Sequence, residues 1–309
     1  MRITAPNMAV ETDPRIAQFL QRAERFMERV EASLDQGIAE PDWGASVAMR
    51  YRRKRSGQGV LVPVQHIADI RFSDLKEVEI QKERLLRNTL QFVQGRGANN
   101  ALLTGARGTG KSSLIRACLH AFADQGLRLI EVDKSDMVDL PEIVDLVAAR
   151  PEKFIIFCDD LSFDEGETGY KALKSALDGS VSAATPNVLI YATSNRRHLL
   201  PEYMSENLNY QHTEDGEVHP GEGVEEKTSL SERFGLWLSF YPFTQDEYLT
   251  IVNQWLQVLE VAPARIAAAR APALMWALER ASRSGRVAWQ FARDYAAQNA
   301  AQDAGSPAA

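Results

Sequence analysis

The residues of this sequence best suited to chemistry form a glycine-rich run that ends in a lysine and a serine. They read Gly105-Ala106-Arg107-Gly108-Thr109-Gly110-Lys111-Ser112 and match the pattern G-x-x-x-x-G-K-[ST] at every fixed position. Glycine adopts positive φ angles without strain, so such a loop can turn several backbone N–H groups toward one anion. A helix that starts near Ser112 would direct its positive dipole end at the same anion. The sequence therefore predicts a cradle for a phosphate chain.

Two side chains give this cradle its chemistry. The Lys111 ammonium can contact the β- and γ-phosphates of a nucleotide, and the Ser112 hydroxyl can ligate Mg²⁺. We take Ser113 as the last residue of the cradle. The alternative, a glycine-rich turn with an incidental lysine, is disfavoured because an apolar strand precedes the run and a helix follows it.

Two carboxylates follow the apolar residues 154–158 and form a second candidate group. They are Asp159 and Asp160. Ligands of a parallel sheet bind beyond the carboxyl ends of its strands, so these acids should lie on the same edge as the cradle. We expect Asp159 to hold Mg²⁺, directly or through water, and Asp160 to polarise an attacking water. The alternative is that both acids only form a turn or cap a helix.

A third polar tip follows the apolar residues 188–193. It contains Asn195, which we expect to contact the γ-phosphate and to orient the water. The alternative is a local Asx turn before Arg196. This signal depends on the cradle and the acids, because a single asparagine after a strand has no functional specificity of its own.

An alternation of apolar strands and amphipathic helices must position these tips. Strands are expected at residues 101–104, 127–132, 154–158, 188–193 and 237–240, with helices at residues 79–94, 112–125, 141–149 and 170–177. The alternation predicts right-handed crossovers and a largely parallel sheet. The number of strands between cradle and acids suits ATPases in which another strand separates the two in space. No Asn-Lys-x-Asp guanine motif occurs, so adenine nucleotides, ATP and ADP, are the expected ligands.

The N-terminal part has two features outside this alternation. Residues 13–36 predict one amphipathic helix, whose apolar stripe comprises Ile16, Leu20, Ala23, Met27, Val30 and Leu34. We expect the stripe to pack on its own domain; the alternative is contact with a neighbouring subunit or a partner. Residues 50–55 carry five positive charges, and we interpret them as a solvated, mobile linker. The alternative for this run is contact with a nucleic-acid backbone.

With these features in place, the chain resembles the AAA+ ATPases, and specifically a bacterial AAA+ family catalogued as domain of unknown function 815. The stretches that carry the resemblance are LLRNTLQFVQGRGANNALLTGARGTGKSSL, GLRLIEV, KFIIFCDDLSF, NVLIYATSNRRHL, SLSERFGLWLSF and the SGR at residues 284–286. The resemblance covers roughly residues 60–295, and an aspartate at position 160 belongs to its pattern. It implies an αβα sandwich of the P-loop (ASCE/AAA+) class with a five-stranded parallel sheet and a helical lid.

The resemblance also implies roles for two arginines. Arg233, in Leu230-Ser231-Glu232-Arg233-Phe234, matches the arginine finger that contacts the γ-phosphate held by the adjacent subunit. Arg286, in Ser284-Gly285-Arg286, matches the sensor-2 arginine that contacts phosphate in its own subunit. A homo-oligomer with nucleotide at its subunit interfaces is therefore expected. From the residues alone, Arg233 would be interpreted as a surface residue or a salt-bridge partner, and Arg286 as a solvated charge beside Arg280 and Arg283.

These assignments divide the chain into four parts. We expect an N-terminal helical extension and basic linker at residues 1–71, a nucleotide-binding α/β domain at residues 72–242, a helical lid at residues 243–300 and a flexible tail at residues 301–309. Residues 202–230 form a long acidic insertion whose histidines, His212 and His219, lack a third convergent ligand for a metal.

Composition agrees with such a protein. The chain has 309 residues, 45% of them apolar and 25% charged, which is typical of a globular protein with a packed core. Its net charge of −7 argues against a general nucleic-acid coat protein but leaves room for a local basic patch. No apolar run is long enough to span a membrane, and residues 1–15 lack a secretory signal. Cys118 and Cys158 lie in apolar segments, which favours a reducing, cytoplasmic setting.

Three functions fit these observations. The first is Mg²⁺-dependent hydrolysis of ATP, coupled to the remodelling or loading of a protein or nucleic-acid client. The second is an ATP-switched adaptor or loader that hydrolyses rarely and holds its partner through the N-terminal helix and the basic run. The third is a small-molecule phosphotransferase, for which the sequence offers no acceptor motif.

Overall fold

The computed structural model describes residues 14–31, 37–163, 167–178, 185–196, 199, 211–212, 218–219 and 230–305. Seven strands form the central sheet, in the order β2-β1-β4-β5-β6-β3-β9. Their bounds are β1 (Ala48–Arg53), β2 (Gly59–Pro63), β3 (Ala101–Gly105), β4 (Leu127–Val132), β5 (Lys153–Cys158), β6 (Val188–Ser194) and β9 (Leu236–Phe240).

The core of the sheet is parallel, as predicted. Strands β4, β5, β6, β3 and β9 all pair in parallel, and β6 lies between β3 and β5. One strand, β6, therefore separates the cradle strand from the acidic strand, as the sequence predicted. Both faces of β3 and β5 are buried, which explains their uninterrupted apolar sequences.

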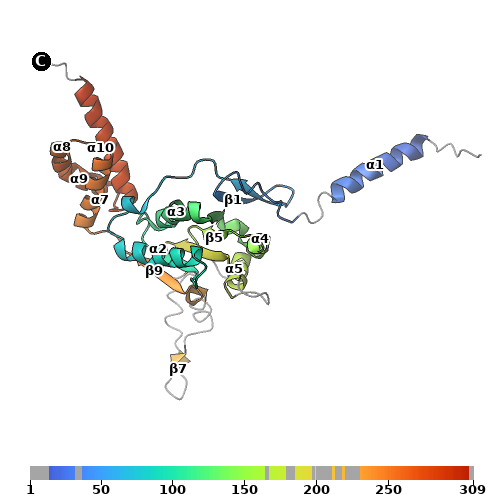
Figure 1. Cartoon of the computed structure of the whole chain (residues 1–309). Helices are drawn as coiled ribbons and strands as arrows, with labels where there is room; N and C mark the ends of the chain where they lie inside the picture. The colour runs from blue at the N-terminus through green and yellow to red at the C-terminus, as the bar shows by residue number, and fades with distance from the viewer. Residues whose placement is uncertain are drawn as a thin grey trace, which may run out of the picture.

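Helices cover both faces of the sheet and complete the three layers of an αβα sandwich (Figure 1). On one face, α2 (Glu79–Val93) and α3 (Lys111–Phe122) pack against side chains such as Leu103 and Ile155. On the other face, α4 (Leu140–Ala148) and α5 (Thr168–Asp178) pack against side chains such as Leu102 and Ile156. Neighbouring residues of one strand thus face opposite layers, as strand geometry requires.

Four helices follow the sheet and gather at one end of the molecule (Figure 1). They are α7 (Gln245–Val258), α8 (Pro263–Ala268), α9 (Arg270–Glu279) and α10 (Gly285–Gly305). Thr244 caps α7 through a capping box with Glu247: the Thr244 N–H donates to Glu247 Oε2 at 2.7 Å, and the Glu247 N–H donates to Thr244 Oγ1 at 3.3 Å. Helix α10 continues to Gly305, beyond the boundary at residue 300 expected from the sequence.

The first two strands correct two predictions. The sheet has seven strands, so the prediction of five was wrong, and β1 pairs with β2 in antiparallel orientation. The interpretation of residues 50–55 as a mobile linker was also wrong, because residues 50–53 belong to β1. Its Tyr51 is buried, whereas Arg50 forms an ion pair with Glu131 at 2.9 Å. Successive residues of this strand point to opposite sides of the sheet. The apolar face is hard to recognise in the sequence because most of the residues in the run are arginines.

Helix α1 (Pro14–Glu31) extends away from the sheet (Figure 1). Its large apolar side chains are between 52% and 69% exposed: Ile16, Phe19, Leu20, Phe26 and Met27. The expected packing of this stripe on its own domain is therefore not found for the side chains that are described. No helix in the described part of the chain has both the length and the apolar character that a membrane span requires.

Most of the acidic insertion at residues 202–230 lies outside the described residues. Within it, β7 (Gln211–His212) pairs with β8 (Val218–His219) in antiparallel orientation. The side chains of His212 and His219 are outside the description. No group of three His, Cys, Asp or Glu side chains that could hold a metal ion is found among the residues that are described.

Candidate functional site

The glycine-rich loop connects the end of β3 to the start of α3, as the sequence predicts. Gly105, Gly108 and Gly110 have φ angles of 122°, 72° and 97°, in the left-handed region that glycine tolerates best. Space is also limited, because a Cβ on Gly105 would lie 1.9 Å from the Phe240 carbonyl oxygen of β9. The backbone of the loop is thus fixed by its own φ angles and by the neighbouring strand.

Lys111 lies at the first position of α3 with its ammonium turned back into this loop. Its Nζ donates to the Gly105 carbonyl at 2.9 Å, the Ala106 carbonyl at 2.7 Å and Asn195 Oδ1 at 3.0 Å. These three bonds use all three donors of the ammonium. The residue is only 5% exposed, and burial lowers the pKa of Lys111 to about 8, against the opposing effect of Asp160. A phosphate chain would supply the negative charge that this partly desolvated cation lacks.

The Ser112 hydroxyl and the first acid meet at the end of β5. Ser112 Oγ donates to Asp159 Oδ1 at 2.6 Å, and Thr193 Oγ1 donates to the same oxygen at 2.6 Å. A hydroxyl and a carboxylate are hard oxygen ligands, and Mg²⁺ sites usually combine one or two of them with water and substrate phosphates. Ser112 and Asp159 therefore fit a Mg²⁺ ion beside the cradle.

The second acid is tied to the polar tip of β6. Asn195 Nδ2 donates to Asp160 Oδ1, while Asn195 Oδ1 accepts from Lys111. Asp160 has a φ of 52° and an exposed side chain, an uncommon conformation for a residue with a side chain. Asn195 therefore joins the cradle lysine to the second acid, and the three predicted polar tips form one network.

Thr193 is a residue of this site that the sequence analysis missed. Besides donating to Asp159, its hydroxyl accepts from the Asp160 N–H at 2.9 Å, and its carbonyl accepts from the Leu161 N–H at 2.7 Å. It thus fixes the backbone that carries both acids. The sequence feature that could have indicated this role is the position of the Thr193 hydroxyl near the end of an apolar strand, two residues before Asn195.

Residues 284–286 lie directly against the cradle. The Gly285 N–H donates to the Gly108 carbonyl at 2.9 Å, and a Cβ on Gly108 would lie 2.9 Å from Ser284 Cβ and 3.4 Å from Arg286 Cβ. Arg286, in the first turn of α10, is therefore placed beside the loop, with its side chain exposed. The packing of Ser284 on Gly108 joins two segments far apart in the sequence, and the residues alone gave no sign of it; only the resemblance placed Arg286 near the phosphate.

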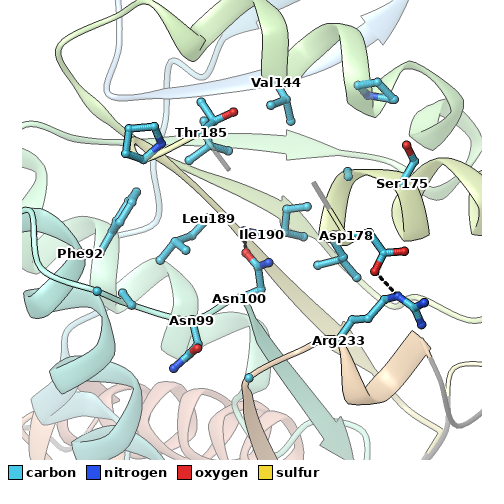
Figure 2. A pocket seen from close by; sticks show the side chains of 18 of the residues that line it. Phe92, Asn99, Asn100, Val144, Ser175, Asp178, Thr185, Leu189, Ile190 and Arg233 are labelled. Atoms are coloured by element: carbon cyan, nitrogen blue, oxygen red, sulfur yellow. Dashed lines mark hydrogen bonds and ion pairs between the residues drawn. The ribbon is translucent and has the colours of Figure 1, made fainter. Parts of the chain in front are cut away.

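Arg233 is the one predicted site residue that lies elsewhere. It precedes β9, which pairs in parallel with β3 from Ala101↔Leu236 to Gly105↔Phe240. The cradle follows the carboxyl end of β3, so Arg233 lies at the amino edge of the same sheet. There it forms an ion pair with Asp178 and lines a pocket of about 480 Å³ (Figure 2). The structure does not bring Arg233 together with the cradle of its own chain.

Comparison with known proteins gives one match by sequence. A family model described as "Protein of unknown function (DUF815)" matches residues 44–299. No curated protein matches the chain.

Several solved structures are similar at low sequence identity. The Thermotoga maritima RuvB Holliday junction branch migration motor is 16% identical, with a TM-score of 0.46, over 74% of this chain and 64% of that chain. The Aeropyrum pernix ORC1 protein in complex with DNA is 18% identical, with a TM-score of 0.46, over 69% and 57%. A chain of the E. coli MS115-1 HORMA:CdnC:Trip13 complex is 13% identical, with a TM-score of 0.44, over 72% and 90%. This chain spans less than two thirds of the length of the first two structures.

Proposed function

Because this chain belongs to the protein family of unknown function DUF815 and has the AAA+ nucleotide-binding fold, we propose that it binds ATP with Mg²⁺ and hydrolyses it to ADP and phosphate. The observation that carries the proposal is the hydrogen-bond network at the carboxyl edge of the sheet. One set of bonds joins the side chains of Lys111, Asn195 and Asp160, and a second joins Ser112, Asp159 and Thr193. The Asp160 N–H donates to Thr193 and links the two sets. The five side chains other than that of Thr193 each have the chemistry that hydrolysis of a triphosphate requires at their places.

The roles follow from the geometry of these groups. Phosphate oxygens would replace the carbonyl partners of Lys111, and the loop N–H groups of Gly108 and Gly110 would face the same anion. Ser112 and Asp159 would hold Mg²⁺, which neutralises phosphate charge when it is bound. Asp160 would accept a proton from the attacking water. Asn195 would fix the position of Asp160 relative to the phosphate.

In this proposal, the two arginines act on the nucleotide sites of different subunits. Arg286 lies beside Gly108 and would contact phosphate in its own subunit. Arg233 lies at the opposite edge of the sheet, so it would serve the cradle of the next subunit in a head-to-tail homo-oligomer. Residues 72–242 would then be the nucleotide-binding domain, and residues 243–300 a lid, since the bond from Gly285 to Gly108 couples these helices to the cradle.

Binding is tested by calorimetry with ATP and Mg²⁺. Wild-type protein is expected to bind, and Lys111→Ala is expected to lose measurable binding, because the buried cation on the phosphates is removed. Circular dichroism and thermal unfolding serve as the control for folding. No heat of binding with the wild type, or undiminished affinity in Lys111→Ala, would contradict the proposal.

The assignment of Arg233 to a neighbouring subunit has its own test. Arg233→Ala and Lys111→Ala proteins are each expected to be inactive, and mixing them is expected to restore part of the turnover. In mixed oligomers, an intact cradle of an Arg233→Ala subunit can face an intact Arg233 of a Lys111→Ala subunit. Normal turnover of Arg233→Ala alone would disprove the role in trans without affecting the binding result.

One observation favours a second candidate, an ATP-switched adaptor with low intrinsic hydrolysis. The apolar stripe of α1 is exposed and suits a partner protein. The basic run supports this candidate less than the sequence suggested, since Arg50 and Arg53 are paired with Glu131 and Asp139. Weak basal turnover that rises strongly with one macromolecule would favour the adaptor over an enzyme that hydrolyses ATP continuously.

A further inference from the structure

At the amino edge of the sheet, Arg233 shares the rim of a pocket with Asp178. Figure 2 shows the two side chains pointing toward each other, with the Arg233 Nε and Asp178 Oδ1 atoms joined as an ion pair. The pocket has a volume of about 480 Å³ and lies between the starts of β6 and β9 and the ends of α2 and α5.

The backbone of Arg233 is held firmly in place. Its neighbours Leu230 and Phe234 are buried, and the Arg233 N–H donates to the Leu230 carbonyl at 3.3 Å. On the far side, Gly235 is packed so closely that a Cβ there would lie 2.4 Å from Asn99 Oδ1. The origin of the arginine side chain is thus fixed by local packing on both sides.

The long side chain itself needs a separate constraint. An arginine has many rotamers, and a fixed Cα does not determine where its guanidinium points. Asp178 can supply that constraint, because α5 is anchored in the core by Tyr170 and Leu173. A carboxylate bound to Nε limits the positions that the guanidinium can take.

The exposed fractions of the two side chains indicate that this ion pair orients Arg233 rather than stabilising the fold. The Arg233 side chain is 23% exposed and the Asp178 side chain 44% exposed. Ion pairs that are this open to water contribute little to folding, because water screens the charges. An acid at this position is better explained by the direction that it gives to the arginine.

We propose that Asp178 is a positioning residue for Arg233, which it holds by Nε in the direction needed to enter the nucleotide site of the next subunit. This inference rests on the proposed role of Arg233 in trans. Asp178 would contact neither ATP nor the water molecule that attacks the γ-phosphate. It would act only by reducing the number of orientations from which Arg233 approaches the phosphate.

The test compares turnover in Asp178→Asn and Asp145→Asn. Asp145 lines the same pocket from α4 and undergoes the same chemical change, so it is a matched control. Asp178→Asn is expected to lower kcat about tenfold with little change in the KM for ATP, and Asp145→Asn to leave both unchanged. Asp178→Glu, which keeps the carboxylate, is expected to recover part of the loss. Turnover is compared at a temperature at which circular dichroism shows every variant folded.

Two further measurements separate positioning from a structural role. In an Arg233→Ala background, Asp178→Asn is expected to have no further effect, because the group through which it acts is gone. Mixed with Lys111→Ala subunits, Asp178→Asn is expected to give more turnover than the two proteins separately, as Arg233→Ala does.

Each outcome decides between the two proposals. If Arg233→Ala loses turnover and Asp178→Asn does not, the positioning role is wrong and the role of Arg233 stands. An increase of kcat in Asp178→Asn would mean that the pair restrains the arginine, which also overturns the inference. A further loss in the Arg233→Ala background would show that Asp178 acts through another group.

Discussion

The two edges of the parallel sheet differ in how many elements of the chain hold their polar side chains. At the carboxyl edge, Lys111, Asp159, Asp160 and Asn195 are connected by hydrogen bonds from three adjacent strands and one helix. At the amino edge, Arg233 projects from a short turn and is oriented by an acid from α5. The side chains of the first edge thus form one hydrogen-bonded cluster within a protomer, whereas Arg233 of the second edge lines a pocket on the opposite side of the sheet.

Because of this difference, the contributions of the two edges should be separable by experiment. Nucleotide binding should depend on residues of the carboxyl edge and be measurable in any folded protomer. The contribution of the amino edge should depend on assembly, because its arginine cannot reach the cradle of its own sheet.

Asp160→Asn is expected to lower ATP turnover by about 10³-fold and to preserve ATP binding. The amide has nearly the same size and shape as the carboxylate, but it cannot accept the proton of the attacking water. Single-turnover hydrolysis and calorimetry measure the two properties separately. If binding is lost together with turnover, Asp160 supports the cradle itself and the division of roles at the carboxyl edge is wrong.

Gly108→Ala is expected to weaken ATP binding by about 10²-fold. Its Cβ would stand 2.9 Å from Ser284 at a φ of 72°, so both the loop and its contact with α10 must shift. Gly126→Ala is the matched control, since Gly126 has a φ of 90° and nothing within 4 Å of the added Cβ. The control is expected to lose only about 1 kcal/mol of stability from its backbone conformation, with normal ATP binding. Equal losses of affinity in both variants would show that the packing on Ser284 is irrelevant to the cradle.

Much of the carboxyl edge could be predicted because its residues are adjacent in sequence to their strands. The loop at residues 105–112, Asp159 and Asn195 each follow an apolar run, and parallel strands bring their carboxyl ends to one edge. Thr193 was missed because nothing in its sequence context distinguishes a hydroxyl that fixes two acids from one that merely ends a strand.

The features that could not be predicted arise from contacts between distant segments. The ion pair of Asp178 with Arg233 and the packing of Ser284 on Gly108 exist only once the sheet has brought these segments together. Strand β1 was hidden for a different reason. Its buried Tyr51 stands among arginines, so composition indicated a linker while the period of two indicated a strand.

ATP affinity is expected to fall as pH rises through 8. Burial lowers the pKa of Lys111 to about 8 in the nucleotide-free protein, and bound phosphates should raise it. The binding-competent ammonium thus predominates well below pH 8 and is lost progressively as the pH rises through 8. Affinity at pH 9 should be about tenfold weaker than at pH 7, with uptake of protons on binding at pH 8. The phosphates themselves titrate near pH 6, below this range.

Calorimetry in buffers of different ionisation enthalpy measures this proton uptake. Lys111→Arg provides the control, because a guanidinium stays charged throughout the range and its residual binding should not change between pH 7 and pH 9. A wild-type affinity that is constant across this range would mean that Lys111 remains protonated, and that the partners at the carboxyl edge compensate fully for its burial.

The smallest effects are expected from the β1–β2 hairpin, which lies at the opposite side of the sheet from the cradle strand β3. Arg53 pairs with Asp139, whose side chain is 9% exposed and also accepts from Tyr51 at 2.7 Å. Arg53→Ala is expected to cost about 1–2 kcal/mol of unfolding free energy, less than a fully buried pair because Arg53 itself is 43% exposed. Arg50→Ala, which breaks the more open pair with Glu131, should cost under ~1 kcal/mol. Urea denaturation measures both values, and turnover should be unchanged in each variant. A loss of turnover in Arg53→Ala without a loss of stability would mean that the hairpin takes part in catalysis, and function could then no longer be divided between the two edges alone.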